Sequence, residues 1–127
     1  MNANNGRPAP RRVVVTGLGA VSPNGKGVDA FWESTRNGVS GIDTISRFDP
    51  KALPCRIAGE VKNFQPEEFL PQKELKRMGR AVPLAIAAAR EALRSAGIAL
   101  QEADLEAKRS WGVILGSGGG AADLIEA

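Results

Sequence analysis

The sequence contains a single thiol, Cys55, and no histidine to activate it. A thiol attacks as its thiolate, and a neighbouring base or cation normally lowers its pKa far enough for that. Without a histidine, we expect Cys55 to be a small buried hydrophobic residue in a strand rather than a nucleophile. The same composition excludes a Cys/His metal cluster and an intrachain disulfide. We therefore predict no catalytic residue, no metal and no cofactor, and a reducing, cytoplasmic environment.

Four basic residues are spaced so that one helix would present them together. Lys73, Lys76, Arg77 and Arg80 stand at i, i+3, i+4 and i+7, which is one face of an α-helix over residues 73–80. The net charge of the chain is +3, which suits an acidic partner. A run of this kind is also common as a solvated surface. Spacing alone leaves both a docking surface and an ordinary basic face open.

A glycine-rich turn follows the first apolar run, residues 13–16. β-branched residues in such a run are typical of a strand buried on both faces. Gly17 and Gly19 then require a tight turn or a close approach to another backbone. A dinucleotide-binding loop needs a third glycine where Ser22 stands, and Pro23 prevents a helix from beginning there. The nucleotide-binding hypothesis is therefore weak.

A second glycine run, residues 116–120, follows a second apolar run at residues 111–115. Backbone N–H groups in such a run can bind an anion, but the Gly-Lys-Ser/Thr ending of a P-loop is absent. We expect residues 111–115 to form a second buried strand. With the first strand and the helices between them, this order predicts a parallel α/β layer.

Two elements are expected between residues 26 and 61. Residues 28–36 are predicted to be helical, with Phe31 and Trp32 facing a core and Gly38 capping the C-terminal end. Residues 55–61 alternate apolar with polar or small side chains, as a half-buried strand does.

The main helical signal covers residues 66–97. A short helix is expected at 66–70 and a second segment at 73–80. The long alanine-rich helix that follows carries Pro83 in its first turn and ends at Gly97, and it can lie flat against a sheet or another helix.

Composition limits the remaining possibilities. Residues 1–11 are expected to be a flexible tail, and no stretch is long and apolar enough for a membrane helix. An aromatic content of 5% supplies few platforms for stacking bases, so we expect no nucleic-acid binding.

Several short motifs together resemble one enzyme family, the elongating β-ketoacyl-acyl-carrier-protein synthases. They are Val13 to Gly25, Ser40-Gly-Ile42, Phe48-Asp49, Ala58-Gly59, Lys76-Arg-Met78, Ser95-Ala-Gly97 and Gly116-Ser-Gly118. One departure is Gly79, where the family usually has an acidic residue. That departure puts a local cap or salt bridge in doubt.

The resemblance implies a thiolase-like α/β fold of layered halves, of which residues 12–127 would be the first, incomplete part. It also implies a decarboxylative Claisen condensation in fatty acid or polyketide synthesis. In that reaction a cysteine carries the acyl chain, and two histidines assist decarboxylation of a malonyl thioester. None of those residues matches a position in this sequence. We therefore expect this chain to be part of a longer, homodimeric enzyme and to be inactive alone.

Two pieces of functional surface are implied by the same resemblance. Lys73, Lys76 and Arg77 match the basic patch that receives the acidic acyl carrier protein, with Arg80 as an extension. Gly118 and Gly119 match the loop beside the acyl pocket. Two alternatives stay open at this point: a non-catalytic carrier-binding partner subunit and, less favoured, a nucleotide-binding α/β domain.

Overall fold

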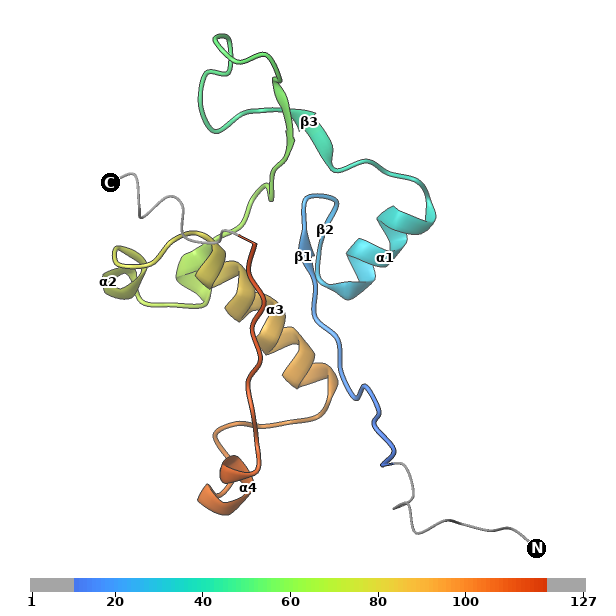
Figure 1. Ribbon diagram of the computed structural model, residues 1–127, viewed down its shortest axis with the longest axis vertical. Coiled ribbons are helices and arrows are strands. Elements are labelled where there is room, and N and C mark those ends of the chain that lie inside the picture. The colour runs from blue at the N-terminus through green and yellow to red at the C-terminus, as the bar shows by residue number, and fades with distance from the viewer. Residues whose placement is uncertain (1–10, 119–127) are drawn as a thin grey trace, which may run out of the picture.

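The structure is a computed structural model, and it describes residues 11–118. Its elements are, in order, β1 (Val21–Ser22), β2 (Gly25–Lys26), α1 (Val28–Arg36), β3 (Ile42–Thr44), β4 (Ile57–Gly59), the 3₁₀-helix η1 (Pro66–Glu68), α2 (Gln72–Leu75), α3 (Ala81–Ser95) and α4 (Leu105–Arg109). Figure 1 shows α3 at the centre, with the β1–β2 hairpin beside it and the β3 segment projecting away. The predicted tail lies outside the described residues except for Arg11.

α3 begins and ends where local sequence signals place it. Pro83 is buried in its first turn, where its missing N–H needs no partner. Beyond its end, Gly97 adopts a φ of +69°, which glycine tolerates without strain. The N–H of Gly97 donates to the Arg94 carbonyl at 3.1 Å, and the N–H of Ile98 donates to the Leu93 carbonyl at 2.9 Å. This is a Schellman cap, and the prediction of the long helix is confirmed.

The segment before β1 lies against α3 through its glycines. A Cβ on Gly17 would be 2.7 Å from the Ala96 nitrogen, and one on Gly19 would be 2.8 Å from the Ala92 nitrogen. Each would also overlap a helix carbonyl oxygen, that of Ala92 or Ala88 respectively. The expected close approach to another backbone is therefore confirmed. The small alanine side chains on this face of α3 permit it.

One carboxylate fastens the N-terminal hairpin and α1 to α3. Glu91, half-buried on α3, accepts hydrogen bonds from the N–H of Ala20 at 2.9 Å and from the N–H of Val28 at 2.8 Å. α1 follows Gly27, which has no side chain to cap the helix, so Glu91 supplies the missing acceptor. Our sequence analysis missed this role. Glu91 is the only acidic residue of the alanine-rich helix Ala81–Ser95, and that isolated position was the signal in the sequence for this role.

α1 covers Val28–Arg36, as predicted, and ends in a second glycine cap. Gly38 has a φ of +66° and donates to the Thr35 carbonyl at 3.2 Å. The expectation that Phe31 and Trp32 face a core is wrong, because their exposed fractions are 38% and 61%. In the described part of the chain, nothing covers this face of the helix enough to bury them.

Both predicted buried strands are wrong as secondary structure. Residues 13–16 and 111–115 join no ladder among residues 11–118, and Val13 and Ile114 are 90% and 99% exposed. The ladders present are antiparallel: β1 pairs with β2, and β3 pairs with β4. The predicted strand at residues 55–61 is shortened to β4, Ile57–Gly59. A strand buried on both faces requires neighbours on each side, and the described residues provide none for these two segments.

The described residues build a small apolar core. Phe64 and Ala87 are its buried hydrophobic members, and the ring of Phe64 stacks on that of Phe69 with centroids 5.5 Å apart. The accessible surface is 10775 Å², whereas a folded monomer of this length exposes roughly 6500 Å². The chain is therefore open, and its elements are joined by local hydrogen bonds more than by buried area.

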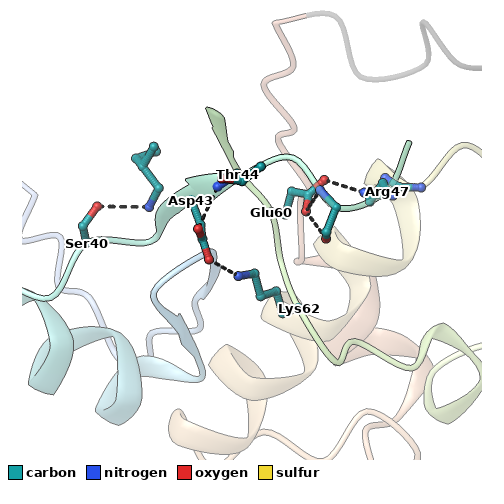
Figure 2. A network of polar contacts seen from close by, with 8 residues as sticks. Ser40, Asp43, Thr44, Arg47, Glu60 and Lys62 are labelled. Atoms are coloured by element: carbon teal, nitrogen blue, oxygen red, sulfur yellow. Dashed lines mark hydrogen bonds and ion pairs between the residues drawn. The ribbon is translucent and has the colours of Figure 1, made fainter. Parts of the chain in front are cut away.

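Polar contacts join the two strands of the β3–β4 hairpin (Figure 2). Lys62 Nζ lies 2.6 Å from Asp43 Oδ2, and Glu60 accepts hydrogen bonds from Ser46 and from the N–H of Arg47. The Lys62 ammonium, and then the Thr44 N–H, lower the pKa of Asp43. The hydrogen bond from Ser46 lowers the pKa of Glu60.

The glycine contacts with α3 give a first testable prediction. Gly19→Ala should loosen the N-terminal segment from α3, because its methyl group would overlap the helix backbone, at a cost of about 1–3 kcal/mol. Amide hydrogen exchange of α3 should become faster. Gly112→Ala is the matched control, since nothing lies within 4 Å of a Cβ there. Equal exchange in both variants would show that the close approach is not required.

The Asp43–Lys62 pair predicts a defined pH dependence. Because the folded pKa of Asp43 is lowered, its contribution to the hairpin is present above pH about 4 and is lost as pH falls through the lowered value. The pKa of Lys62 is raised by Asp43, so its contribution is present below pH about 10.4 and is lost as pH rises through the raised value. Lys62→Gln should move the Asp43 titration, followed by carboxyl NMR shifts, towards its ordinary midpoint. Lys51→Gln should leave it unmoved, and an unmoved midpoint in Lys62→Gln would contradict the assignment.

Candidate functional site

The basic segment lies on α2 and the turn that follows it. α2 begins after Pro71, whose carbonyl accepts the N–H of Glu74 at 2.9 Å, and ends at Leu75. The chain then continues through two tighter turns, with hydrogen bonds from the N–H of Arg77 to Glu74 and from the N–H of Met78 to Leu75. α2 is thus a single turn of helix, and the predicted continuous helix over residues 73–80 is wrong.

Three of the four basic side chains are exposed, and none of the three is ion-paired within residues 11–118. Lys73 lies in α2, Lys76 is its C-terminal cap and Arg77 follows in the turn. Among residues 11–118, no carboxylate lies within ion-pair distance of any of them. Elsewhere in the same range, Lys62 is held by a nearby acid. These three residues form what we call the basic triad.

Arg80 is placed differently from the basic triad. It is half-buried at the N-terminal end of α3, and its Nη2 donates a hydrogen bond to the carbonyl oxygen of Val61 at 3.0 Å. The prediction that all four cations share one helical face is therefore wrong. Gly79, buried between the turn and α3, separates Arg80 from the triad, and glycine is the weakest helix former after proline. This glycine was the signal in the sequence that the helix would end.

The structure also locates the single cysteine. Cys55 is exposed, not buried as predicted, because β4 begins only at Ile57 and the hairpin covers no core. Its Sγ lies 3.6 Å from the Ile57 carbonyl oxygen, and the chain has no histidine. Residues 11–118 contain no group of three or more His, Cys, Asp or Glu side chains able to hold a metal ion.

The glycine motifs do not form a nucleotide site in the described structure. Gly17 and Gly19 face the backbone of α3, so the space that a pyrophosphate would need is filled by the helix. Gly118 lies in an exposed bend, and Gly119, the other residue expected beside an acyl pocket, lies outside the described residues. No helix among the residues searched is long and apolar enough to cross a membrane.

A cleft lies between α3, η1 and the β1–β2 hairpin, with a volume of about 460 Å³. Its charged lining residues are Lys26, Glu68, Arg90, Glu91 and Arg94. Several of these groups already have structural partners: the Lys26 ammonium donates to the Asn63 carbonyl, Arg90 lies over the Phe69 ring, and Glu91 holds two backbone N–H groups. The cleft therefore offers packing rather than an acid–base pair.

Comparison with known proteins places this chain in a sequence family. Residues 10–126 match the family described as Beta-ketoacyl synthase, N-terminal domain. The chain is 41% identical over 116 residues to 3-oxoacyl-[acyl-carrier-protein] synthase 2 of Staphylococcus aureus (strain COL), covering 91% of this chain and 27% of that relative. It is 43% identical over 112 residues to the tetracenomycin polyketide synthase ketoacyl synthase beta subunit of Streptomyces glaucescens, covering 88% of this chain and 27% of that relative.

A solved structure supports the same relationship. The ishigamide ketosynthase/chain length factor superposes with a TM-score of 0.65 and 39% sequence identity, over 74% of this chain and 23% of that chain. The predicted α/β, thiolase-like fold class is thereby confirmed for part of an N-terminal region. The chain spans about a quarter of the length of these relatives. It belongs to the β-ketoacyl synthase family, within the N-terminal domain.

Proposed function

We propose that this chain is part of a 3-oxoacyl-[acyl-carrier-protein] synthase and that it carries the surface on which the acyl carrier protein docks. The synthase would catalyse decarboxylative Claisen condensation of acyl and malonyl thioesters in fatty acid or polyketide synthesis. Family membership and the names of the relatives support the reaction. The nucleophile and the histidines of that reaction are assigned to no residue of this chain.

The single observation that carries the docking proposal is the basic triad. Lys73, Lys76 and Arg77 are exposed, have no carboxylate partner among residues 11–118, and lie within five consecutive positions. Unpaired cations on a short segment raise the local positive potential, which speeds the approach of an acidic protein. Glu74 lies within the same segment and offsets one of the three charges. The segment of residues 73–77 therefore keeps a net charge of +2.

We extend the proposal to other parts of the expected enzyme. The loop at Gly118 and Gly119 would border the acyl pocket, and residues 12–127 would form part of the first half of the synthase domain. The complete protein would be a cytoplasmic homodimer. We propose no cofactor and no metal for the reaction, because the thioester chemistry needs neither.

A second candidate is a non-catalytic subunit that binds the carrier protein and pairs with a separate ketosynthase. The similarity to a ketoacyl synthase beta subunit and to a ketosynthase/chain length factor favours it. Both candidates use the same docking surface, so they differ only in the nucleophile. A labelled acyl group trapped on the complete form of this protein would identify the catalytic candidate. A label found on the partner ketosynthase but not on this protein would identify the non-catalytic subunit.

Charge reversal tests the docking surface. The variant Lys73→Glu, Lys76→Glu, Arg77→Glu should weaken carrier-protein binding, because exposed charge pairs contribute up to about 1 kcal/mol each and act mainly on encounter. The loss should shrink as salt is raised. In the complete synthase, the KM for an acyl carrier substrate should rise, while turnover of an acyl-coenzyme A changes little.

A charge-matched control is available elsewhere on the chain. Lys51, Lys108 and Arg109 are exposed, on the β3–β4 hairpin loop and on α4. Reversing these three changes the net charge equally and should leave carrier affinity near that of the parent. Equal losses in both triple variants, or equal losses with the carrier and coenzyme A substrates, would mean that the triad is an ordinary solvated surface.

The exposed thiol yields a prediction about the chain alone. The 127-residue protein should show no condensing activity, because Cys55 has no histidine to act as its base. Incubation with an acyl carrier substrate should leave the mass of Cys55 unchanged. Transfer of an acyl group that Cys55→Ser abolishes would overturn the expectation.

A further inference from the structure

Arg80 joins two parts of the fold that are separate in sequence. Its guanidinium donates to the Val61 carbonyl at 3.0 Å across 19 positions, and it lies at the N-terminal end of α3. Val61 itself stands between Glu60 and Lys62, which bind Ser46, Arg47 and Asp43 across the β3–β4 hairpin (Figure 2). Arg80 thus connects the base of that hairpin with the junction between the basic triad and α3.

The position of Arg80 argues for a contact role rather than a surface role. A cation at a helix N-terminus opposes the helix dipole, so this site is unfavourable for a charge that faces only water. A hydrogen bond from a guanidinium to a carbonyl is charge-assisted and stronger than a neutral one. Arg80 is also half-buried, whereas Lys73, Lys76 and Arg77 are exposed. Its environment therefore suits a structural partner better than a docking protein.

The connection to the triad is short. Arg77 and Arg80 are separated by Met78, which is half-buried, and Gly79, which is buried. The N–H of Met78 donates to the Leu75 carbonyl, and the N–H of Val82 donates to the Gly79 carbonyl at 3.1 Å. A segment held at Arg80 has few ways to reorient across these bonded turns. Fixing Arg80 therefore limits the directions in which the triad can point.

We propose that Arg80 is a positioning residue of the docking surface: its hydrogen bond to Val61 orients the basic triad, and its own charge does not touch the carrier protein. This inference rests on the proposed docking function. It changes the expected four-residue surface into three docking cations and one support. It also separates the attraction of the carrier protein by the triad from the orientation of the triad by Arg80.

The test is a double-mutant cycle read at several salt concentrations. Arg80→Met removes the donor and keeps an unbranched side chain, and it should weaken carrier binding about fivefold at low salt, with a loss that shrinks as salt screens the triad. In the background of the reversed triad it should have no further effect, because a support acts through what it positions. Arg80→Lys keeps a donor and should restore most of the affinity. Arg109→Met, on α4, is the control for loss of one exposed cation.

Each other outcome overturns a defined part of the inference. A loss with Arg80→Met that persists in full in the background of the reversed triad would make Arg80 a direct docking residue. Unchanged affinity in Arg80→Met, with a loss in the triad variant, would remove the positioning role alone. Unchanged affinity in the triad variant would defeat the docking function itself and the positioning role with it. Should Arg80→Met not fold, Arg80→Gln is used, with hydrogen exchange at residues 72–77 as the check on orientation.

Discussion

The carboxylate of Glu91 is the contact on which the N-terminal part of the structure depends. It holds the N–H of Ala20 before β1 and the N–H of Val28 at the start of α1. Gly27 cannot cap α1, and the two-residue strands β1 and β2 are too short to hold a hairpin alone. Close approach of Gly17 and Gly19 to α3 brings the segment to the helix, and Glu91 then fixes its register. Hydrogen bonds to Glu91 and the close contact of small residues therefore hold the N-terminal segment against α3, a role that a buried core has in larger domains.

The open surface explains why polar contacts matter so much. With 10775 Å² accessible against roughly 6500 Å² for a folded monomer of this length, the chain buries about two-thirds of the area that a compact monomer buries, so hydrophobic burial stabilises it correspondingly less. The most exposed apolar side chains gather in residues 13–15 and 113–115, where β-branched residues and leucine would otherwise cover a sheet. Exposed apolar segments of this kind mark surfaces that bind further protein. The relatives are more than three times as long as this chain, since 116 aligned residues make up 27% of their length.

Helices in this chain were predictable and strands were not, for a physical reason. The bounds of α1 and the end of α3 follow from signals within a few residues, above all the left-handed glycines Gly38 and Gly97. A strand is defined by its neighbours, and residues 13–16 and 111–115 find none among residues 11–118. The family motifs identified the fold class correctly because they record the complete domain. The predicted strands at residues 13–16 and 111–115 are not formed, because their ladder partners are missing from the described part.

The basic residues also show that local sequence patterns do not reveal contacts with residues distant in the sequence. Helical spacing grouped Arg80 with the triad, since Lys73 to Arg80 covers two turns of an ideal helix. Buried Gly79 interrupts that helix, and the hydrogen bond to Val61, 19 positions away, decides where the Arg80 guanidinium lies. Other exposed cations, such as Arg36 and Lys51, lie beside acids only a few positions away, which screens their charge locally. The triad has no ion pair among the described residues, and Glu74 offsets only one of its three charges, so a net positive field is available to a partner. In the proposed docking function, an acidic carrier protein would be met by this exposed segment and not by Cys55, which lies before β4 on the β3–β4 hairpin.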